Sequence, residues 1–274
     1  MHQIKIAILD MYKGEPNQGM RNIHELLDSY AANKKIDVHY KVYDVRGKHE
    51  VPDSSYDAYI GTGGPGDPTE KEGWEMKWVM MMNSILHHNA NNESKKLVFL
   101  ICHSYQVMCL HFDIGIVCPR KRESFGIFPV HKTHESNTNQ FMSQLHDPFY
   151  AVDSRKYQVV EDENFNNNKL NAKIMAMEKI RDHVPLQRAI MALQFTPEIF
   201  GTQFHPEADA LGMIYYLEGE EKKELVIKNY GIHRYHSMLN HLNDPDKIML
   251  TQLIFLPTFL DDVLGHTLVQ QSNI

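Results

Sequence analysis

Cys102 is the first residue of the chain whose position suggests chemistry. It follows an apolar stretch at 97–101 and precedes a stretch of helical character at 104–112. A cysteine at such a turn between strand and helix presents its side chain outward, and the positive end of the helix favours the thiolate. The alternative is a cysteine that acts only as a small buried apolar side chain, and for a cysteine taken alone that is the commoner case.

A second segment, QFHPE at 203–207, places an imidazole and a carboxylate two residues apart. In extended backbone, His205 and Glu207 point to the same side of the chain. The carboxylate then fixes the tautomer of the imidazole while the imidazole faces a nucleophile. One histidine among 17 carries little information, but His-Pro-Glu after an apolar strand is more specific.

The third segment is the glycine-rich turn at 61–68, with the sequence GTGGPGDP. Glycines after a strand let backbone N–H groups turn outward, where they hold a developing oxyanion. The same turn could hold a phosphate or simply reverse the chain. It is not a Walker loop, because no Gly-Lys-Ser/Thr follows. By itself the turn leaves these three interpretations open.

Strand and helix patterns alternate over the first hundred residues and provide the frame for these segments. We predict strands at 4–9, 37–43, 58–61 and 97–101, and helices around 23–30 and 74–85. This alternation implies parallel pairing, right-handed crossovers and helices on both faces of a sheet. Ligands of such sheets bind beyond the carboxyl ends of the strands, where the glycine-rich turn and Cys102 both lie.

The pattern then becomes rich in strands. We predict strands at 126–131 and 149–152, a polar surface loop at 162–171, and two strands, 189–195 and 199–204, joined by a tight hairpin turn. Beyond Asp209, apolar residues recur at helical spacing, with Pro257 as a break. We therefore expect one α/β domain over residues 1–209 and a helical extension over 210–274. The extension either packs on that domain or makes a dimer contact.

Composition limits the class of protein. The chain has 28 Lys and Arg against 35 Asp and Glu, a formal net charge of −7, which argues against non-specific binding to nucleic acid or to an anionic membrane. No apolar run approaches the ~20 residues that span a bilayer. The N-terminal segment lacks the pattern of a signal peptide. Three cysteines do not make a disulfide framework, so we expect a reducing cytoplasm.

Together the three segments resemble the class I glutamine amidotransferases. In that family a Gly-Gly-Pro-x-x-Pro turn, a strand–Cys–helix elbow and a late Gln-Phe-His-Pro-Glu segment recur in this order, here over about residues 4–209. Gln106 matches the family's Cys-x-Gly-x-Gln, and ESFG at 123–126 matches its Glu-x-Gly region loosely. The resemblance implies a flavodoxin-like α/β fold, with a mostly parallel sheet flanked by helices and followed here by the helical extension.

The resemblance also implies a role for each matching residue. Cys102 would attack the side-chain amide of glutamine, His205 would take the thiol proton and deliver it to ammonia, and Glu207 would orient His205. The remaining roles are an oxyanion hole from the backbone N–H groups of Gly64 and His103, and substrate binding by Gln106. No cofactor is implied.

The elbow departs from the family's Gly-x-Cys-x-Gly, because Leu100 and Ser104 stand where the family has glycine. A Ser-His pair that the family often carries is represented at best by Ser154-Arg155. Three functions therefore stay open: a glutaminase that supplies ammonia to a separate synthetase, a stand-alone γ-glutamyl hydrolase, and a catalytically silent binding or regulatory module. No ATP-binding loop is visible, so an ammonia acceptor would lie on another polypeptide.

The many histidines do not predict a metal site. None lies at the spacing of a helical ligand motif with an acid, and the adjacent His87 and His88 point to different faces. We interpret them as scattered surface residues and expect no metal.

Overall fold

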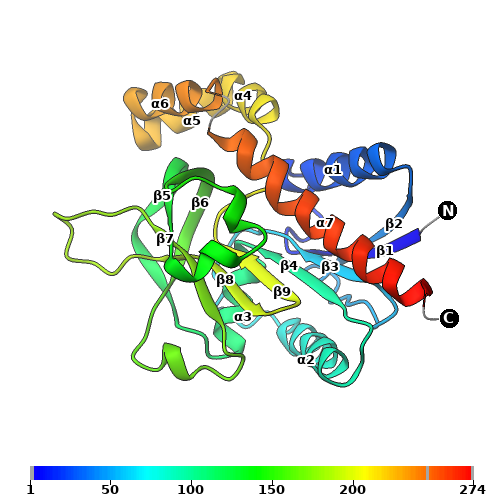
Figure 1. Cartoon of the computed structure of the whole chain (residues 1–274). Coiled ribbons are helices and arrows are strands. Elements are labelled where there is room, and N and C mark those ends of the chain that lie inside the picture. The colour runs from blue at the N-terminus through cyan, green and yellow to red at the C-terminus, as the bar shows by residue number, and fades with distance from the viewer. Residues whose placement is uncertain (1–2, 245–246, 273–274) are drawn as a thin grey trace.

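Nine strands form one mixed sheet within residues 3–244 and 247–272, which are the residues that the computed structural model describes (Figure 1). The strand order is β2-β1-β3-β4-β9-β8-β7-β5-β6. The strands are β1 (Gln3–Asp10), β2 (Asp37–Asp44), β3 (Ala58–Gly61), β4 (Leu97–Ile101), β5 (Ile116–Lys132), β6 (Phe149–Val160), β7 (Lys173–Glu178), β8 (Ile190–Thr196) and β9 (Ile199–Thr202).

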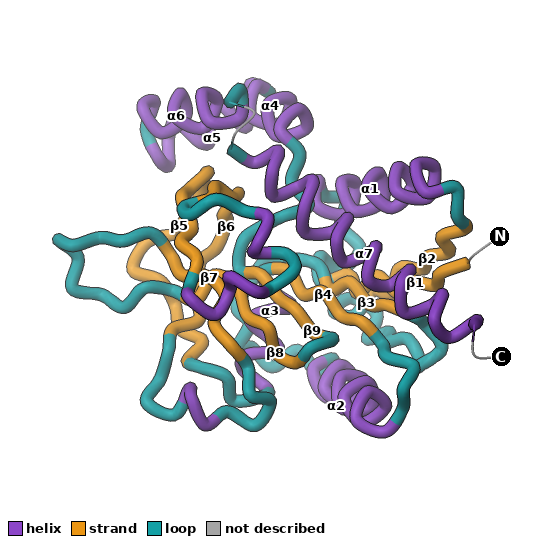
Figure 2. Tube along the Cα trace, viewed as in Figure 1, coloured by secondary structure: helices purple, strands orange, loops and turns teal. Residues whose placement is uncertain are grey.

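Helices occupy both faces of the sheet and one of its ends (Figure 2). The α-helices of the described residues are α1 (Gln18–Lys34), α2 (Glu75–Asn91), α3 (His103–His111), α4 (Ala210–Glu218), α5 (Glu220–Tyr230), α6 (Ile232–Leu242) and α7 (Ile248–Ser272). Short 3₁₀ helices lie at His134–Thr138, Met142–Gln144 and Phe165–Asn167.

The sheet is mixed, which corrects the prediction of a mostly parallel one. β2, β1, β3, β4 and β9 pair in parallel, whereas β8, β7, β5 and β6 join by antiparallel pairing. Parallel neighbours need a long crossover, here supplied by helices, while antiparallel neighbours accept a loop. The connections from β5 to β9 contain no α-helix in the described chain, so this part of the sheet folds by antiparallel pairing. β5 and β6 are also longer than predicted, and β7 was not predicted.

The core has two main layers, one on each face of the sheet. Along β1, Ile6 and Ile8 face a cluster that includes side chains of α1 and α7. Ala7 and Leu9 face the opposite cluster, with α2 and α3. A strand covered on both faces needs apolar residues at successive positions, which explains the continuous apolar run at 4–9.

The C-terminal helices pack in two different ways. α4, α5 and α6 form a small cluster against β5 and β6, and α7 runs beside α1 across the sheet (Figure 1). Phe255 and Leu260 of α7 are fully buried in the core. Whether residues 210–274 count as a separate unit or contact a second copy stays a prediction.

α7 also corrects one expectation from composition. It contains a 21-residue stretch, Ile248–Leu268, with a mean hydropathy of 1.4, long and apolar enough to cross a membrane by length and composition alone. The expectation that no apolar run approaches this length was therefore wrong. In this structure the helix packs against the sheet, and burial in a core accounts for the same composition.

Candidate active site

Cys102 lies in a strained turn between β4 and α3. Its backbone has φ 48° and ψ −94°, a region that residues other than glycine seldom adopt. The Cys102 N–H donates to the Thr202 carbonyl at the end of β9, at 2.7 Å. The side chain is 5% exposed at the N-terminus of α3. Strain of this kind, about 1–3 kcal/mol, persists where the surroundings hold the residue in place.

His205 and Glu207 come from the segment that follows β9. The His205 N–H donates to the Val152 carbonyl of β6 at 2.9 Å, which fixes the segment across the sheet. His205 Nδ1 lies 2.8 Å from Glu207 Oε1, and the imidazole is also close enough to Cys102 to interact with it electrostatically. Because Nδ1 faces the carboxylate, Nε2 is the nitrogen left for the thiol.

The charges of this site favour a protonated imidazole. Burial alone lowers the pKa of His205, but attraction to Glu207 and Cys102, together with hydrogen bonds to both, raises the pKa well above its ordinary value. Burial raises the pKa of the Cys109 thiol, so that thiol stays neutral. The three predicted residues Cys102, His205 and Glu207 thus lie together at the carboxyl edge of β4 and β9.

Gln106 belongs to a chain of amide groups beneath the nucleophile. Its Nε2 donates to the Tyr157 carbonyl and to Gln203 Oε1, both at 3.1 Å. Gln203 Nε2 in turn donates to Cys102 Sγ at 3.7 Å. Gln106 is buried, so in this structure its amide group holds Gln203 and β6 in place around Cys102.

Gly64 lies in the glycine-rich turn after β3, and His103 is the first residue of α3, directly after Cys102. A Cβ on Gly64 would come within 2.4 Å of the Met11 carbonyl oxygen, so only glycine fits there. The His103 side chain is buried. Burial first, and then the positive charge of Arg46, lowers the pKa of His103 to about 3. Its imidazole is therefore neutral and places no positive charge beside Cys102.

Tyr12, directly after β1, also lies at this site and was missed from the sequence. A Cβ on Gly63 would lie 2.7 Å from His205 Cε1 and 2.9 Å from the Tyr12 hydroxyl. Burial, and then the negative charges of Glu207 and Cys102, raises the pKa of Tyr12 well above its ordinary value, so the phenol stays neutral. Its position at the carboxyl end of a predicted strand was the signal that would have found it.

The glutamine amidotransferase class-I family model matches residues 19–211, more than half of the chain. The chain belongs to the class-I glutamine amidotransferase family. The resemblance inferred from the three motifs is thereby confirmed. No curated protein sequence matches the chain.

Solved structures of amidotransferases share the fold. A glutamine amidotransferase from Thermotoga maritima has a TM-score of 0.63 at 17% identity, covering 96% of this chain and 99% of that one. A putative GMP synthase subunit from Thermoplasma acidophilum has a TM-score of 0.53 at 17% identity, covering 76% and 86%. The glutaminase domain of Trypanosoma brucei CTPS with bound acivicin has a TM-score of 0.53 at 13% identity, covering 74% and 86%.

This chain accommodates the two departures in its elbow through glycines on the flanking strands. Leu100 pairs with Gly61 of β3 and with Gly201 of β9. A Cβ on Gly61 would lie 2.8 Å from Ser104 Cβ and 2.9 Å from Leu100 Cδ2. Ser104 Oγ bridges the Ile101 N–H and carbonyl at 2.9 and 3.0 Å, which ties α3 to the end of β4. The family makes room for the turn with glycines in the elbow itself, whereas in this chain Gly61 and Gly201 of the neighbouring strands make that room.

The Ser154-Arg155 segment lies directly behind the nucleophile. The Cys102 thiol lies 3.8 Å from the Ser154 carbonyl oxygen, which accepts its hydrogen bond. The fully buried Arg155 side chain pairs with Asp153 at 2.9 Å and with Glu178 at 3.3 Å. Burial opposes the charge of Arg155, but Asp153, Glu178 and Cys102 together raise its pKa. A permanent cation thus occupies the interior beside Cys102.

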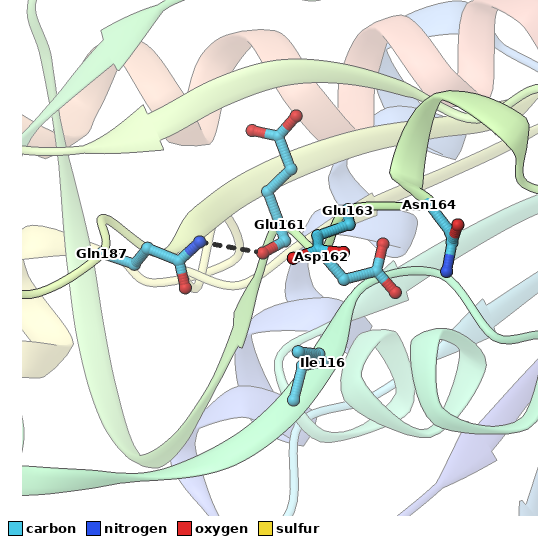
Figure 3. A pocket seen from close by; sticks show the side chains of 6 residues that line it. All are labelled: Ile116, Glu161, Asp162, Glu163, Asn164 and Gln187. Carbon is cyan, nitrogen blue, oxygen red and sulfur yellow. Dashed lines mark hydrogen bonds between the residues drawn. The ribbon is translucent and has the colours of Figure 1, made fainter.

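A separate surface cavity lies away from these residues. Figure 3 shows a hollow of about 570 Å³ in which Gln187 Nε2 donates to the Glu161 carbonyl at 3.0 Å. It is lined by Ile116, Glu161, Asp162, Glu163, Asn164 and Gln187. None of the predicted site residues lines it, and it holds no nucleophile. In the part of the chain that the structure describes, no group of three His, Cys, Asp or Glu side chains is arranged around a metal position.

Proposed function

We propose that this amidotransferase hydrolyses the side-chain amide of L-glutamine through a thioester on Cys102. The observation that carries the proposal is the meeting of three side chains: Cys102 at a strained elbow, and His205 held at 2.8 Å by Glu207, with Cys102 and Glu207 both raising the pKa of His205. A buried histidine whose charged form is favoured by a carboxylate is suited to hold the thiol proton.

The reaction follows from this geometry. Sγ of Cys102 attacks the amide carbon of glutamine while the thiol proton resides on His205. The tetrahedral adduct collapses as the C–N bond breaks, and His205 delivers its proton to the leaving ammonia. Water, deprotonated by His205, then attacks the thioester and releases glutamate and the thiol. Glu207 holds the imidazole in one orientation through both steps.

The oxyanion of each adduct needs hydrogen-bond donors in a region without bulk water. We assign the backbone N–H groups of Gly64 and His103 to this task, supported by the glycine that the Met11 carbonyl enforces at position 64 and by the place of His103 directly after the nucleophile. The neutral His103 side chain leaves stabilisation to these backbone dipoles. The substrate role that the family motif implies for Gln106 stays a proposal, because the Gln106 amide donates to the Tyr157 carbonyl and to Gln203 in this structure.

We further propose that ammonia passes to an acceptor on a separate synthetase. The support comes from two solved relatives, a glutaminase domain of CTPS and a putative GMP synthase subunit. If ammonia is instead released to solvent at full rate by the isolated chain, a stand-alone hydrolase acting on glutamine or another γ-glutamyl compound becomes the better description.

The test is intact-mass labelling with acivicin, an electrophilic glutamine analogue, alongside ammonia release from glutamine. We expect one label on the wild type, protection by excess glutamine, and no label on Cys102→Ala. Fast alkylation of Cys102 by iodoacetamide without acivicin labelling would redirect the proposal to another acyl substrate. If all three cysteines react equally slowly with both reagents, a binding or regulatory module becomes the better description of the chain.

A further inference from the structure

Arg46 is a buried arginine that bridges two loops of the site. It lies just beyond β2, and its side chain is 2% exposed. Nη1 donates to the Pro65 carbonyl at 2.5 Å and to the Met11 carbonyl at 3.2 Å. One guanidinium nitrogen thereby joins the glycine-rich turn to the end of β1.

The other side of the guanidinium is anchored by Glu72. Nε and Nη2 of Arg46 both lie 2.9 Å from Glu72 Oε2. The Trp74 indole N–H donates to the same oxygen at 3.0 Å, and Lys13 Nζ lies 2.7 Å from Oε1. Hydrogen bonding to Arg46, more than any other contact, lowers the pKa of Glu72 to about 2. Glu72 therefore holds the guanidinium group of Arg46 in one orientation, independently of the contacts that the guanidinium makes with the turn.

The glycine-rich turn packs closely against Arg46 and Met11 at two of its glycines. Gly66 adopts φ +100°, and a Cβ there would lie 3.2 Å from Arg46 Nη2. Gly64, next to the gripped Pro65 carbonyl, packs against the Met11 carbonyl that Arg46 also holds. Arg46 therefore holds two carbonyl groups beside Gly64: that of Pro65, the next residue, and that of Met11, against which Gly64 packs.

We propose that Arg46 is a positioning residue for the oxyanion hole: it fixes the peptide units around Gly64 so that its N–H faces the reacting carbonyl. The inference rests on the proposed acyl transfer at Cys102, and it adds a residue that lies outside the three motifs. Arg46 touches no reacting atom and holds the turn through the Pro65 and Met11 carbonyls.

The experiment compares two reactions of Cys102 that differ in their need for an oxyanion hole. Acylation by glutamine or by p-nitrophenyl acetate passes through a tetrahedral oxyanion, whereas alkylation by iodoacetamide displaces iodide and forms none. In Arg46→Met we expect kcat for glutamine and the rate of acylation by the ester to fall by roughly ten- to a hundredfold. KM and the rate of alkylation should stay within about threefold of wild type.

Two further variants separate position from charge and from folding. Lys13→Met removes another cation from Glu72 without touching the turn, so acylation should stay within twofold. Arg46→Lys keeps the charge but cannot reach both carbonyls and Glu72, so acylation should recover only in part. If Arg46→Met does not fold, the test rests on Arg46→Lys, in which we expect the rate of acylation to fall by roughly tenfold.

The outcomes divide clearly. Equal losses of acylation and alkylation would assign Arg46 to general folding, and unchanged acylation would remove it from the site; either result overturns the inference. If the wild type is acylated by the ester yet releases no ammonia from glutamine, the proposed function fails while the inference is still decided by the acylation ratio. A wild type that neither reagent acylates overturns both.

Discussion

Replacing Glu207 with glutamine tests whether its carboxylate is coupled to the nucleophile. The variant keeps an oxygen at hydrogen-bonding distance from His205 Nδ1 but removes the charge that raises the pKa of His205. A neutral imidazole is then favoured, and with it the neutral Cys102 thiol. The rate of Cys102 alkylation at neutral pH therefore falls, because the imidazole holds the thiol proton less well.

The magnitude follows from the burial of the pair. The side chains of His205 and Glu207 are 13% and 2% exposed, so solvent screens their attraction little. A hydrogen bond to a charged partner in such surroundings contributes roughly 1.5–3 kcal/mol. A loss of about 2 kcal/mol corresponds to a roughly 30-fold lower rate of Cys102 alkylation at neutral pH, because about 1.4 kcal/mol is one factor of ten.

The assay is the second-order rate of Cys102 alkylation by iodoacetamide between pH 5 and 9, with kcat for glutamine measured in parallel. Glu218→Gln, an exposed change on α4, serves as the matched control and should leave both unchanged. An alkylation profile in Glu207→Gln that overlays the wild type within twofold would refute the coupling, whatever happens to kcat.

Three other predictions concern the frame of the site. Arg46 lowers the pKa of Glu72 from 4.5 to about 2, so this ionisation stabilises the fold above about pH 4.5 and is lost as pH falls toward 2. The ionisation of Glu72 contributes about 3 kcal/mol to the free energy of unfolding at pH 7, and urea unfolding should show less than half of this contribution at pH 3. Glu72→Gln should lack this pH dependence. Gly61→Ala should destabilise the chain by about 1–3 kcal/mol, because its Cβ meets Leu100 and Ser104, and the loss in Gly61→Ala/Leu100→Ala should be smaller than the sum of the two single losses. Phe255→Ala should lower the free energy of unfolding by about 3–5 kcal/mol, whereas a peripheral α7 would tolerate it at under about 1 kcal/mol.

Local sequence patterns were sufficient to predict the parallel half of the fold. β3 and β4 have the predicted bounds, because a strand covered on both faces must be apolar at every position and ends where glycine or cysteine turns begin. The same rule placed the glycine-rich turn and Cys102 at one edge. His205 and Glu207, which follow β9, lie at the same edge because β9 pairs with β4.

The antiparallel half could not be predicted to the same extent, because its pairing depends on partners far along the chain. β7 (KIMAME) lacks a clear alternation, and its burial is set by β5 and β8. Arg46 lies in a polar stretch with no local pattern. Its value to the site depends on the Pro65 and Met11 carbonyls, which only the folded chain brings together. The role of Gly61 likewise depends on its register with Leu100.

The adjacency of β4 and β9 has a consequence for how the protein is made. Cys102 and His205 lie 103 positions apart in the chain, and strands β5 to β8 of the antiparallel half are synthesised between them. Such long-range pairing closes late in folding. A nascent chain that has passed Cys102 but not His205 carries a thiol without its proton acceptor. α7 adds its core side chains later still, so the core on this face of the sheet is completed only after α7 has emerged from the ribosome.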